Sequence, residues 1–460
     1  MIPLPARSKE HLAVFGLGAS GRATARALAA GGARVTAWDD DADSRAAAEK
    51  EHIALGDLGA ADWSAFSALV LSPGVPLTHP VPHPVVLKAQ KAGRPVIGDI
   101  ELLAEACPGA ILIGITGTNG KSTTSALIHH VLREAGRRVQ IGGNFGPPVL
   151  GLEPPQPGEA VVLELSSFQL DLTERAAFEV AVLLNVTPDH LDRHGDMKGY
   201  VAAKKRIFRR RSGTGQTAIV GVDDDYGRAI RDELLKDGAW KVIPISVTSE
   251  LENGVFVRDG ELVDTTDTSD WFIGDIETLR GRHNWQNAAA AWAVARTQGI
   301  APATIAAALA TYPGLPHRLE QIAEIDGVRY VNDSKATNGE AAARALSSFS
   351  DIYWIAGGLA KDDGLFPCDP YLGHVRHAFL IGDAAEAFER HLAGRVPVTR
   401  SGDLATAISD ARKSADGEGA TAPVALLSPA CASYDQFRNF VQRGESFRRI
   451  VETMAKEARA

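Results

Sequence analysis

The segment from Gly114 to Thr124, with the sequence GITGTNGKSTT, has the residue types of a triphosphate-binding loop. The apolar residues 110–113 before it predict a buried strand, and residues 125–135 after it have helical character. Backbone N–H groups in a glycine-rich turn before a helix can bind an anion, and the helix N-terminus adds partial positive charge. Lys121 would neutralise phosphate oxygens, and the Ser122 hydroxyl would hold Mg²⁺.

The glycines of this loop do not follow the strict pattern G-x-x-x-x-G-K-[ST]. That pattern requires a glycine where Ile115 stands, whereas the glycines lie at positions 114, 117 and 120. The segment therefore predicts a variant P-loop rather than that of a typical GTPase. A chance glycine-rich turn that ends in Lys-Ser is the alternative.

Two further polar residues follow apolar runs in the same part of the chain. Glu164 ends a very apolar run, where a carboxylate is costly unless it is paired or bound to a metal. Because Mg²⁺ prefers hard oxygen ligands near phosphates, we predict Glu164 as a ligand alongside Ser122; a structural ion pair is the alternative. His190 follows another apolar run, close to Asp189, Asp192 and Arg193, and imidazole can ligate a metal or orient a phosphate; a structural histidine is the alternative.

The N-terminal segment Gly16 to Gly21 matches G-x-G-x-x-G, and the acidic Asp39 follows about twenty residues later. Taken alone, this spacing favours NAD or FAD. Its physical content is weaker, namely the close approach of a phosphate-bearing ligand to a helix N-terminus. The alternatives for this segment are that it binds another nucleotide or that its glycines only allow tight packing.

The C-terminal third contains an arginine and two polar clusters that could serve a ligand. Arg318 lies where this segment begins, and an arginine from another domain can neutralise a transferring phosphoryl group; an exposed linker arginine is the alternative. Polar clusters follow two predicted strands, at residues 332–338 and 428–433. Two such clusters at strand ends favour ligand binding over plain loops.

The elements that must position these residues alternate between strand and helix, which predicts an α/β protein with doubly wound parallel sheets. At 460 residues the chain is too long for one ordinary domain. Glycine- and proline-rich junctions predict a Rossmann-like domain over residues 1–108, a P-loop ATPase-like domain over 109–313 and a second Rossmann-like domain over 314–460. Residues 242–271 predict small strands and turns.

Composition excludes several classes of protein. An apolar content of 45% and a charged content of 23% are those of a soluble globular protein, and the net charge of −9 argues against nonspecific nucleic-acid binding. Cys107, Cys368 and Cys431 lack metal-ligand spacing, which fits a reducing cytoplasm. The N-terminus lacks the pattern of a signal peptide, and no apolar run reaches the length of about eighteen residues expected of a membrane-spanning helix.

In combination, the motifs resemble those of the Mur ligases, the ATP-dependent amide-forming enzymes of bacterial cell-wall precursor synthesis. The resemblance covers nearly the whole chain, in the right order. Beside the P-loop, the similar segments are 185–194 (NVTPDHLDRH), 281–284 (GRHN), 315–318 (LPHR) and 332–338 (NDSKATN). Segments 333–338 and 427–437, with Arg443 and Gly444, are most similar to the branch that joins D-glutamate to UDP-N-acetylmuramoyl-L-alanine.

The resemblance implies a reaction in which ATP phosphorylates the alanyl carboxylate and the amine of D-glutamate attacks the acyl phosphate. A tetrahedral intermediate then collapses to the amide. It also implies two Mg²⁺ ions and a carbamate on Lys204, which would turn a cation into a carboxylate-like ligand. Plain Lys204 contacting phosphate is the alternative.

The resemblance assigns the remaining residues by ligand. ATP would contact Gly117, Thr118, Asn119, Gly120, Lys121, Ser122, Thr123, Asn284, Asn287, Arg318 and Asp333. The metal ligands would be Ser122, Glu164, His190 and Lys204, and Lys121, His190 and Lys204 would be catalytic. The UDP-sugar would contact Gly18, Ala19, Ser20, Asp39, Ser72, Asn144 and Ser166. D-Glutamate would contact Thr337, Lys361, Ser433 and Phe440.

The resemblance also moves the glycine motif at 16–21 from NAD to the UDP diphosphate, with Asp39 near the uridine. The rival hypotheses are a sister Mur ligase that adds a diamino acid, a folylpolyglutamate synthase, a dinucleotide oxidoreductase fused to a P-loop regulatory ATPase, and a nucleotide-binding scaffold without catalysis. The C-terminal motifs argue against the first two.

Overall fold

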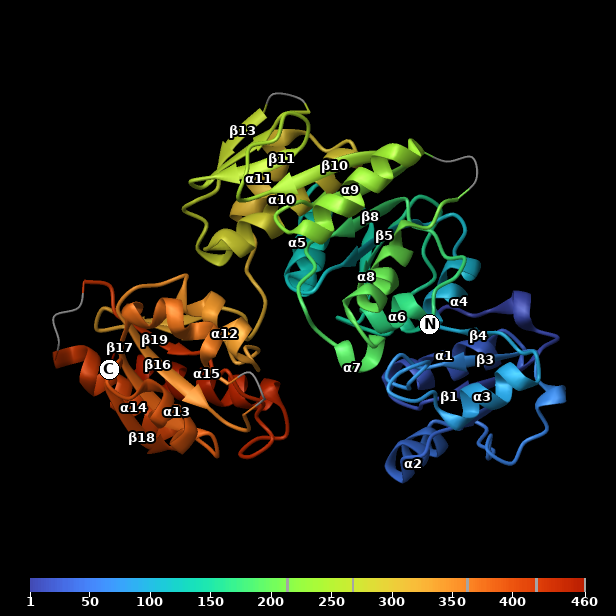
Figure 1. Cartoon of the computed structure of the whole chain (residues 1–460), viewed down its shortest axis with the longest axis horizontal. Coiled ribbons are helices and arrows are strands. Elements are labelled where there is room, and N and C mark those ends of the chain that lie inside the picture. Colours follow the sequence, from blue (N-terminus) through green and yellow to red (C-terminus); the bar gives the residue numbers. More distant parts are fainter. Residues whose placement is uncertain (212–214, 267–268, 361–363, 418–420, 459–460) are drawn as a thin grey trace. The chain divides into compact units, whose positions relative to one another are not determined.

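The computed structural model describes residues 1–211, 215–266, 269–360, 364–417 and 421–458 (Figure 1). The chain forms two compact units. The first contains residues 1–275 and 284–312, and the second contains residues 276–283 and 313–460. No helix in these described ranges is both long and apolar enough to cross a membrane.

The first unit begins with a parallel four-stranded sheet in the order β2-β1-β3-β4. Helices α1 and α4 pack on one face through apolar side chains, and α3 packs on the other. The bounds are β1 His11–Phe15, β2 Arg34–Trp38, β3 Ala68–Leu71, β4 Val96–Ile97, α1 Ala19–Ala30, α2 Ala42–Lys50, α3 Pro84–Lys91 and α4 Asp99–Ala106.

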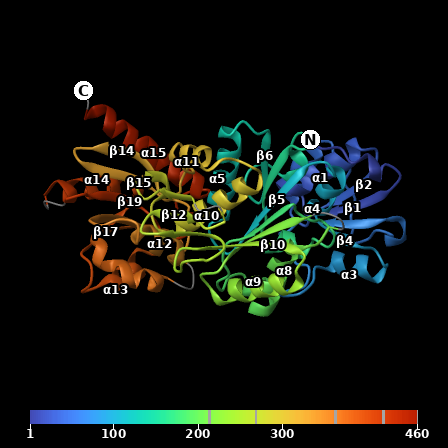
Figure 2. The same cartoon turned by 90° about the horizontal axis from the view of Figure 1, so that it is seen from above.

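A nine-stranded sheet, in the order β13-β12-β11-β10-β9-β8-β5-β7-β6, completes the first unit. Figure 2 shows α5 and α10 on one side of this sheet and α8 and α9 on the other. The strands are β5 Ile111–Thr116, β6 Val139–Gly143, β7 Ala160–Glu164, β8 Val180–Leu183, β9 Gln216–Gly221, β10 Trp240–Ser246, β11 Val255–Arg258, β12 Glu261–Asp264 and β13 Ser269–Phe272. The helices are α5 Lys121–Glu134, α6 Ser167–Asp171, α7 Leu191–His194, α8 Met197–Lys205, α9 Asp225–Asp237, α10 Arg282–Thr297 and α11 Pro302–Ala310.

Strands β6, β7, β5, β8 and β9 run parallel, so their carboxyl ends lie along one edge of the sheet. Their side chains are apolar and almost entirely buried, as expected for strands that helices cover on both faces. The polar residues that follow β5, β7 and β8 are therefore brought together at this edge.

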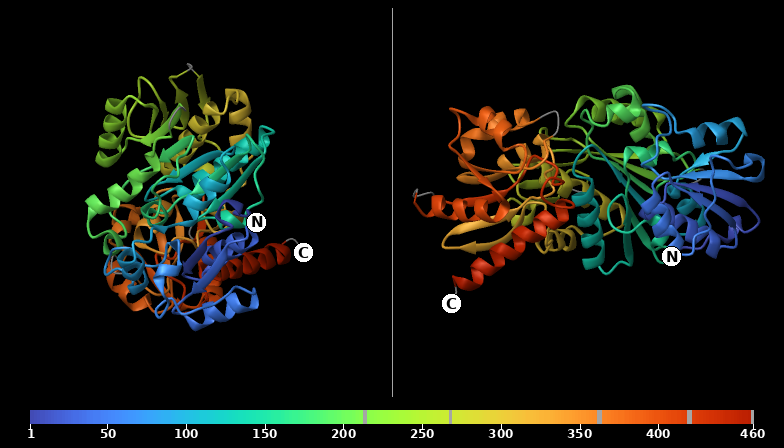
Figure 3. Two further views of the ribbon diagram at one scale, coloured as in Figure 1. Left: turned by 90° about the vertical axis from the view of Figure 1, so that its right-hand side faces the viewer. Right: turned by 90° about the horizontal axis from the view of Figure 1, so that it is seen from below.

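The second unit contains a six-stranded sheet in the order β14-β15-β19-β16-β17-β18, with only β14 antiparallel. Helices α12 and α13 pack on one face, and α14 and the long α15 pack on the other (Figure 3). The bounds are β14 Glu320–Ile325, β15 Val328–Asn332, β16 Ile352–Gly357, β17 Val375–Ile381, β18 Val398–Gly402, β19 Val424–Leu427, α12 Gly339–Leu346, α13 Ala385–Leu392, α14 Leu404–Gly417 and α15 Phe440–Glu457.

The predicted α/β class with three sheets is confirmed. One local difference is that α5 begins at Lys121, four residues earlier than the sequence pattern indicates. Ser122, Thr124 and Ser125 are buried in its first turns, so a polar stretch that looks like loop belongs to the helix. The predicted domain boundaries at 108 and 313 stay predictions.

Candidate functional site

The P-loop connects β5 to α5 and depends on two glycines in left-handed conformations. Gly117 has φ +155° and Gly120 has φ +85°. A Cβ atom at Gly120 would lie 2.4 Å from Asn287 Oδ1, and one at Gly117 would lie 3.0 Å from Leu184 Cβ. A side chain at either position would collide with α10 or with the end of β8, so the loop shape requires glycine there.

The P-loop is tied to the loop that follows β8. The Thr118 amide donates to the Asn185 carbonyl at 2.9 Å, and the Asn119 amide donates to Asn185 Oδ1 at 2.9 Å. The Thr187 amide donates to Thr118 Oγ1 at 3.0 Å. These bonds hold the residues on either side of the predicted phosphate site in one rigid arrangement.

Helix α10 supports the P-loop helix from behind. Thr124 Oγ1 donates to Asn287 Oδ1 at 2.9 Å, and Asn287 Nδ2 donates to Asn284 Oδ1 at 3.1 Å. Both asparagines are buried. The structure thus places Asn284 and Asn287 beside the P-loop, and their contact with ATP stays a prediction.

Two lysines converge on one carbonyl oxygen of the P-loop. Lys121 Nζ donates to the Gly117 carbonyl at 2.9 Å, and Lys204 Nζ donates to the same oxygen at 2.7 Å. Lys204 is only 1% exposed, and its Nζ lies 4.5 Å from the ring centroid of Tyr200. Burial, followed by the nearby Lys121 charge, lowers the pKa of Lys204 well below its ordinary value. Both effects disfavour the charged form of Lys204.

Glu164 ends β7 with an unsatisfied oxygen. The side chain is 2% exposed, and Oε1 accepts from Asn144 Nδ2 at 2.6 Å. Its other oxygen, Oε2, has no hydrogen-bond partner among the residues that the structure describes. A buried carboxylate oxygen without a donor is costly, and a bound cation would satisfy it.

The Ser122 hydroxyl and the Glu164 carboxylate are oxygen donors of the kind that suits Mg²⁺ beside phosphates. In the described ranges, no three side chains of His, Cys, Asp or Glu gather as a metal site. The predicted ligands include only one residue of the acidic type, Glu164. A carbamate at Lys204 would add a second anionic ligand close to the P-loop, where hard oxygen donors suit Mg²⁺.

His190 is the N-cap of the short helix α7 and has a left-handed conformation, with φ +52°. Its ring centroid lies 4.9 Å from that of Phe168, and its Nε2 lies 3.5 Å from Asp189 Oδ2. Burial lowers the pKa of His190 below its ordinary value, although Asp189 opposes this effect. A neutral imidazole suits metal ligation. Figure 1 shows α6, α7 and α8 grouped beneath the central sheet.

The glycine motif of the N-terminal sheet forms a tight turn before α1. The Leu17 amide donates to Asp39 Oδ2, and Ser72 Oγ donates to the Gly16 carbonyl at 2.7 Å. A Cβ atom at Gly18 would meet nothing within 4 Å, so space remains beside the first turn of α1, where Ala19 and Ser20 lie. In the structure Asp39 and Ser72 shape this turn, and their expected contacts with UDP stay predictions.

Ser166 caps helix α6. Its hydroxyl accepts from the Gln169 amide, and Gln169 Oε1 accepts from the Ser166 amide at 3.1 Å, so the two residues form a capping box. Asn144, which follows β6, donates to Glu164, and Ser166 follows Glu164 by two residues after the end of β7. Their expected role near the muramoyl-alanine portion remains a prediction.

The second unit brings Asp333 to the end of β15. Its carboxylate accepts from Ser428 Oγ at 2.8 Å and from the Leu319 amide at 3.3 Å. Burial raises the pKa of Asp333 to about 7, against the hydrogen bond from Ser428 and the charge of Arg318. The structure thus places the two strand-end clusters and Arg318 in one neighbourhood of this unit.

Arg443 links the two polar clusters, a role that the sequence alone does not reveal. This buried guanidinium donates to Ser334 Oγ at 3.0 Å and to the Cys431 carbonyl at 3.1 Å. The backbone carbonyl of Phe440 accepts from Ser334 Oγ at 2.8 Å. Ser433 is buried and belongs to the cluster at residues 428–433, and Thr337 belongs to the cluster at residues 332–338. Lys361 lies outside the described residues.

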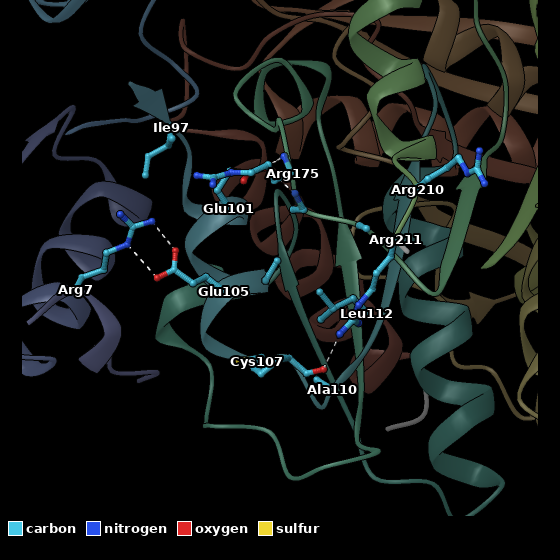
Figure 4. A pocket seen from close by; sticks show the side chains of 14 residues that line it. Arg7, Ile97, Glu101, Glu105, Cys107, Ala110, Leu112, Arg175, Arg210 and Arg211 are labelled. Atoms are coloured by element: carbon cyan, nitrogen blue, oxygen red, sulfur yellow. Dashed lines mark hydrogen bonds and ion pairs between the residues drawn. The ribbon is translucent and has the colours of Figure 1, made fainter. Parts of the chain in front are cut away.

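A separate hollow of about 320 Å³ lies at the opposite edge of the central sheet, near the amino ends of β5 and β8 (Figure 4). Apolar residues including Ile97, Ala104 and Leu112 line it. At its rim, Arg7 pairs with Glu105. None of the predicted site residues lines this hollow, so it is distinct from the P-loop site.

Two family models match the chain: the Mur ligase middle domain over residues 115–295 and the MurD-like N-terminal domain over residues 10–98. A UDP-N-acetylmuramoylalanine–D-glutamate ligase of Rhodospirillum rubrum is 49% identical over 99% of this chain and 97% of its own length. The protein of the same name from Caulobacter vibrioides is 50% identical over 98% of this chain and 97% of its own length.

Solved structures of low sequence identity share the fold. The UDP-N-acetylmuramate-alanine ligase MurC of Thermotoga maritima has a TM-score of 0.54 and 15% identity to this chain. The match covers 98% of this chain and 100% of MurC. The MurF ligase of the same organism, solved with ADP, has a TM-score of 0.55 at 19% identity and covers 81% of this chain, which covers 91% of MurF. With its two matching domains and its full-length relatives near 50% identity, this chain belongs to the Mur ligase family.

Proposed function

We propose that this protein is an ATP-dependent ligase that joins D-glutamate to UDP-N-acetylmuramoyl-L-alanine and releases ADP and phosphate. The observation that carries the proposal is full-length identity near 50% to ligases named for this reaction. The geometry supports it, because a rigid P-loop, two lysines and an unsatisfied carboxylate lie at the carboxyl edge of the central sheet.

Amide formation from a carboxylate at neutral pH needs activation, and ATP supplies it by phosphorylating the alanyl carboxylate. The P-loop amides and Lys121 would hold the phosphates and offset their charge in the transition state. The amine of D-glutamate then attacks the acyl phosphate, and the tetrahedral intermediate expels phosphate. The reactants are all anionic, so positioning and charge compensation are the main tasks of the protein.

The residues suited to hold Mg²⁺ are Ser122, Glu164, His190 and Lys204. A Mg²⁺ ion held by these residues would supply charge that offsets the negative phosphate oxygens. Glu164 Oε2 is the buried oxygen that lacks a donor. The side chain of Asn144 holds the other oxygen and so fixes the orientation of the carboxylate.

We propose that Lys204 carries a carbamate. Its neutral amine would attack CO₂, form an N–C bond and release a proton, which leaves a carboxylate-like group on the side chain. Two observations support this assignment: the shared Gly117 carbonyl, which places the lysine beside Lys121, and the almost complete burial of Lys204. Both disfavour a second ammonium group.

In the other unit, we propose that Thr337, Lys361, Ser433 and Phe440 bind D-glutamate and that Arg318 and Asp333 contact ATP. Around the N-terminal sheet, the loop 16–21 with Asp39 and Ser72 would bind the UDP portion. The space beside Gly18 and the free helix N-terminus of α1 support phosphate binding there.

The test is ADP release with UDP-N-acetylmuramoyl-L-alanine against a panel of amino acids. We expect turnover only when ATP, the UDP-sugar and D-glutamate are all present. Turnover with meso-diaminopimelate or lysine would contradict the proposal in favour of a sister ligase. ATP hydrolysis that does not depend on the UDP-sugar would indicate a regulatory ATPase instead.

A further inference from the structure

Asp99 is a buried carboxyl group that contacts the loop assigned above to the UDP diphosphate. It is the first residue of α4 and is 4% exposed. Its Oδ2 lies 2.5 Å from Ser20 Oγ, in the first turn of α1. Its other oxygen, Oδ1, is buried without a hydrogen-bond partner among the described residues. No sequence motif points to Asp99.

Asp99 has no ion pair among the described residues, although as the first residue of α4 it lies at a helix N-terminus, which favours a negative charge. Burial raises its pKa, and only hydrogen bonds, chiefly from Ser20, oppose that effect. Helix α1 and the turn 149–151 pack against α4, and the turn 149–151 has no titratable side chain. The charged groups on these and neighbouring elements have partners of their own. Glu101 accepts from the amides of residues 174–176, and Glu105 pairs with Arg7. Glu51 pairs with both Arg22 and Arg26, and Asp171 pairs with Arg206.

The direction of the hydrogen bond between Ser20 and Asp99 decides what Ser20 can offer a ligand. If Asp99 were ionised, Ser20 would donate its only proton to the carboxylate and present lone pairs outward. Diphosphate oxygens are acceptors, so such a hydroxyl could not bind them. If Asp99 is a carboxylic acid, it donates to Ser20 Oγ, and the Ser20 proton remains available for the ligand.

The neighbouring backbone leaves room for an anion at this turn. A Cβ atom at Gly18 would meet nothing within 4 Å, and Gly18 is the N-cap of α1 with no side chain to cap the helix. The first amides of α1 are therefore open to a ligand, and the helix N-terminus favours a negative one. Ser20 lies within this turn.

We propose that Asp99 is a positioning residue for the UDP-bearing substrate: as a carboxylic acid it donates to Ser20 Oγ and turns the Ser20 proton toward a diphosphate oxygen. The inference rests on the proposed function, in which this loop binds UDP. It adds a residue from α4 that does not itself contact the ligand. It also explains why a carboxyl group is tolerated close to a site for an anion.

The test measures the affinity of UDP-N-acetylmuramoyl-L-alanine for the full chain by calorimetry. We expect Asp99→Ala and Ser20→Ala each to weaken binding about tenfold, the effect of one lost hydrogen bond to a charged group. The double variant should be no weaker than either single variant. Asp99→Asn should bind within about threefold of the wild type, because its amide can donate to Ser20 as the acid does. Glu105→Ala, on the same helix, is the matched control and should bind as the wild type does.

Infrared difference spectra between the wild type and Asp99→Asn test the protonation state separately. We expect the carbonyl band of a carboxylic acid at about pH 7 in the wild type and its loss in the variant; this band reports the protonation state, while the affinities report the positioning role. An ionised Asp99, wild-type affinity in Asp99→Ala, or a tenfold loss in Asp99→Asn would each overturn the inference. If the wild type fails to bind the UDP-sugar, the proposed function itself is wrong.

Discussion

Replacing Lys204 with methionine should leave the fold as stable as before, or more stable, while removing activity. Lys204 Nζ is almost completely buried and shares the Gly117 carbonyl with Lys121 Nζ. Methionine fills a similar volume without a polar group. The variant therefore separates what Lys204 does for the reaction from what it does for stability.

The expected change in stability follows from two opposing terms. Losing the hydrogen bond from Lys204 to Gly117 costs about 1 kcal/mol, and the carbonyl keeps its bond from Lys121. For unmodified Lys204, removing a buried amine whose one hydrogen bond among the described residues is to Gly117 regains about 1–3 kcal/mol of desolvation. The free energy of unfolding should therefore stay equal or rise by up to about 2 kcal/mol. The rate of ADP release should fall at least about 100-fold, because the proposed metal ligand is gone.

Urea unfolding and ADP release measure the two quantities. The matched control is Lys205→Met, since Lys205 is partly exposed and pairs only with Glu233 at the surface. It should change the free energy of unfolding by less than about 0.5 kcal/mol and leave the rate intact. If Lys204→Met keeps near-wild-type activity, or loses more than about 2 kcal/mol of stability, Lys204 is a structural cation and the reasoning fails.

Other substitutions probe the P-loop and the second unit. In the wild type, the pKa of Asp333 is about 7 in the folded state and lower in the unfolded state, so the free energy of unfolding falls by up to about 4 kcal/mol as the pH rises from about 4 to about 7. Asp333→Asn should abolish this fall, as measured by urea unfolding across that pH range. Gly120→Ala should destabilise by more than about 2 kcal/mol through its collision with Asn287, whereas Gly136→Ala, with a positive φ but no neighbour within 4 Å, should lose only about 1 kcal/mol; equal losses in thermal unfolding would rule out the collision. Arg443→Lys should lower stability by about 2–3 kcal/mol, because lysine cannot make the several bonds of the planar guanidinium, and an unchanged Tm would show that these bonds are unimportant.

The sequence predicts much of the fold because local patterns and tertiary structure agree there. The continuous apolar runs at β5, β7 and β8 indicate buried parallel strands, and the polar residues after them share one edge of the sheet. By contrast, β14 was not predicted, because its residues alternate weakly and are only half buried at the edge of its sheet.

Site geometry is harder to predict than site composition. The family resemblance assigns Lys121 and Lys204 to the same ligand, but their meeting at the Gly117 carbonyl depends on the packing of α8. Tyr200 precedes Lys204 by four residues on that helix, so their contact could have been predicted from helical spacing. Asp99 and Arg443 act across long sequence separations, and no local pattern reveals their partners.

The most direct test of the central claim is mass spectrometry of the product formed from ATP, UDP-N-acetylmuramoyl-L-alanine and isotopically labelled glutamate. With D-glutamate, we predict a product whose mass is the sum of the UDP-sugar and the amino acid less one water, formed in equal amount to ADP. Equal incorporation of L-glutamate, or ADP release without the amide, would contradict the assignment.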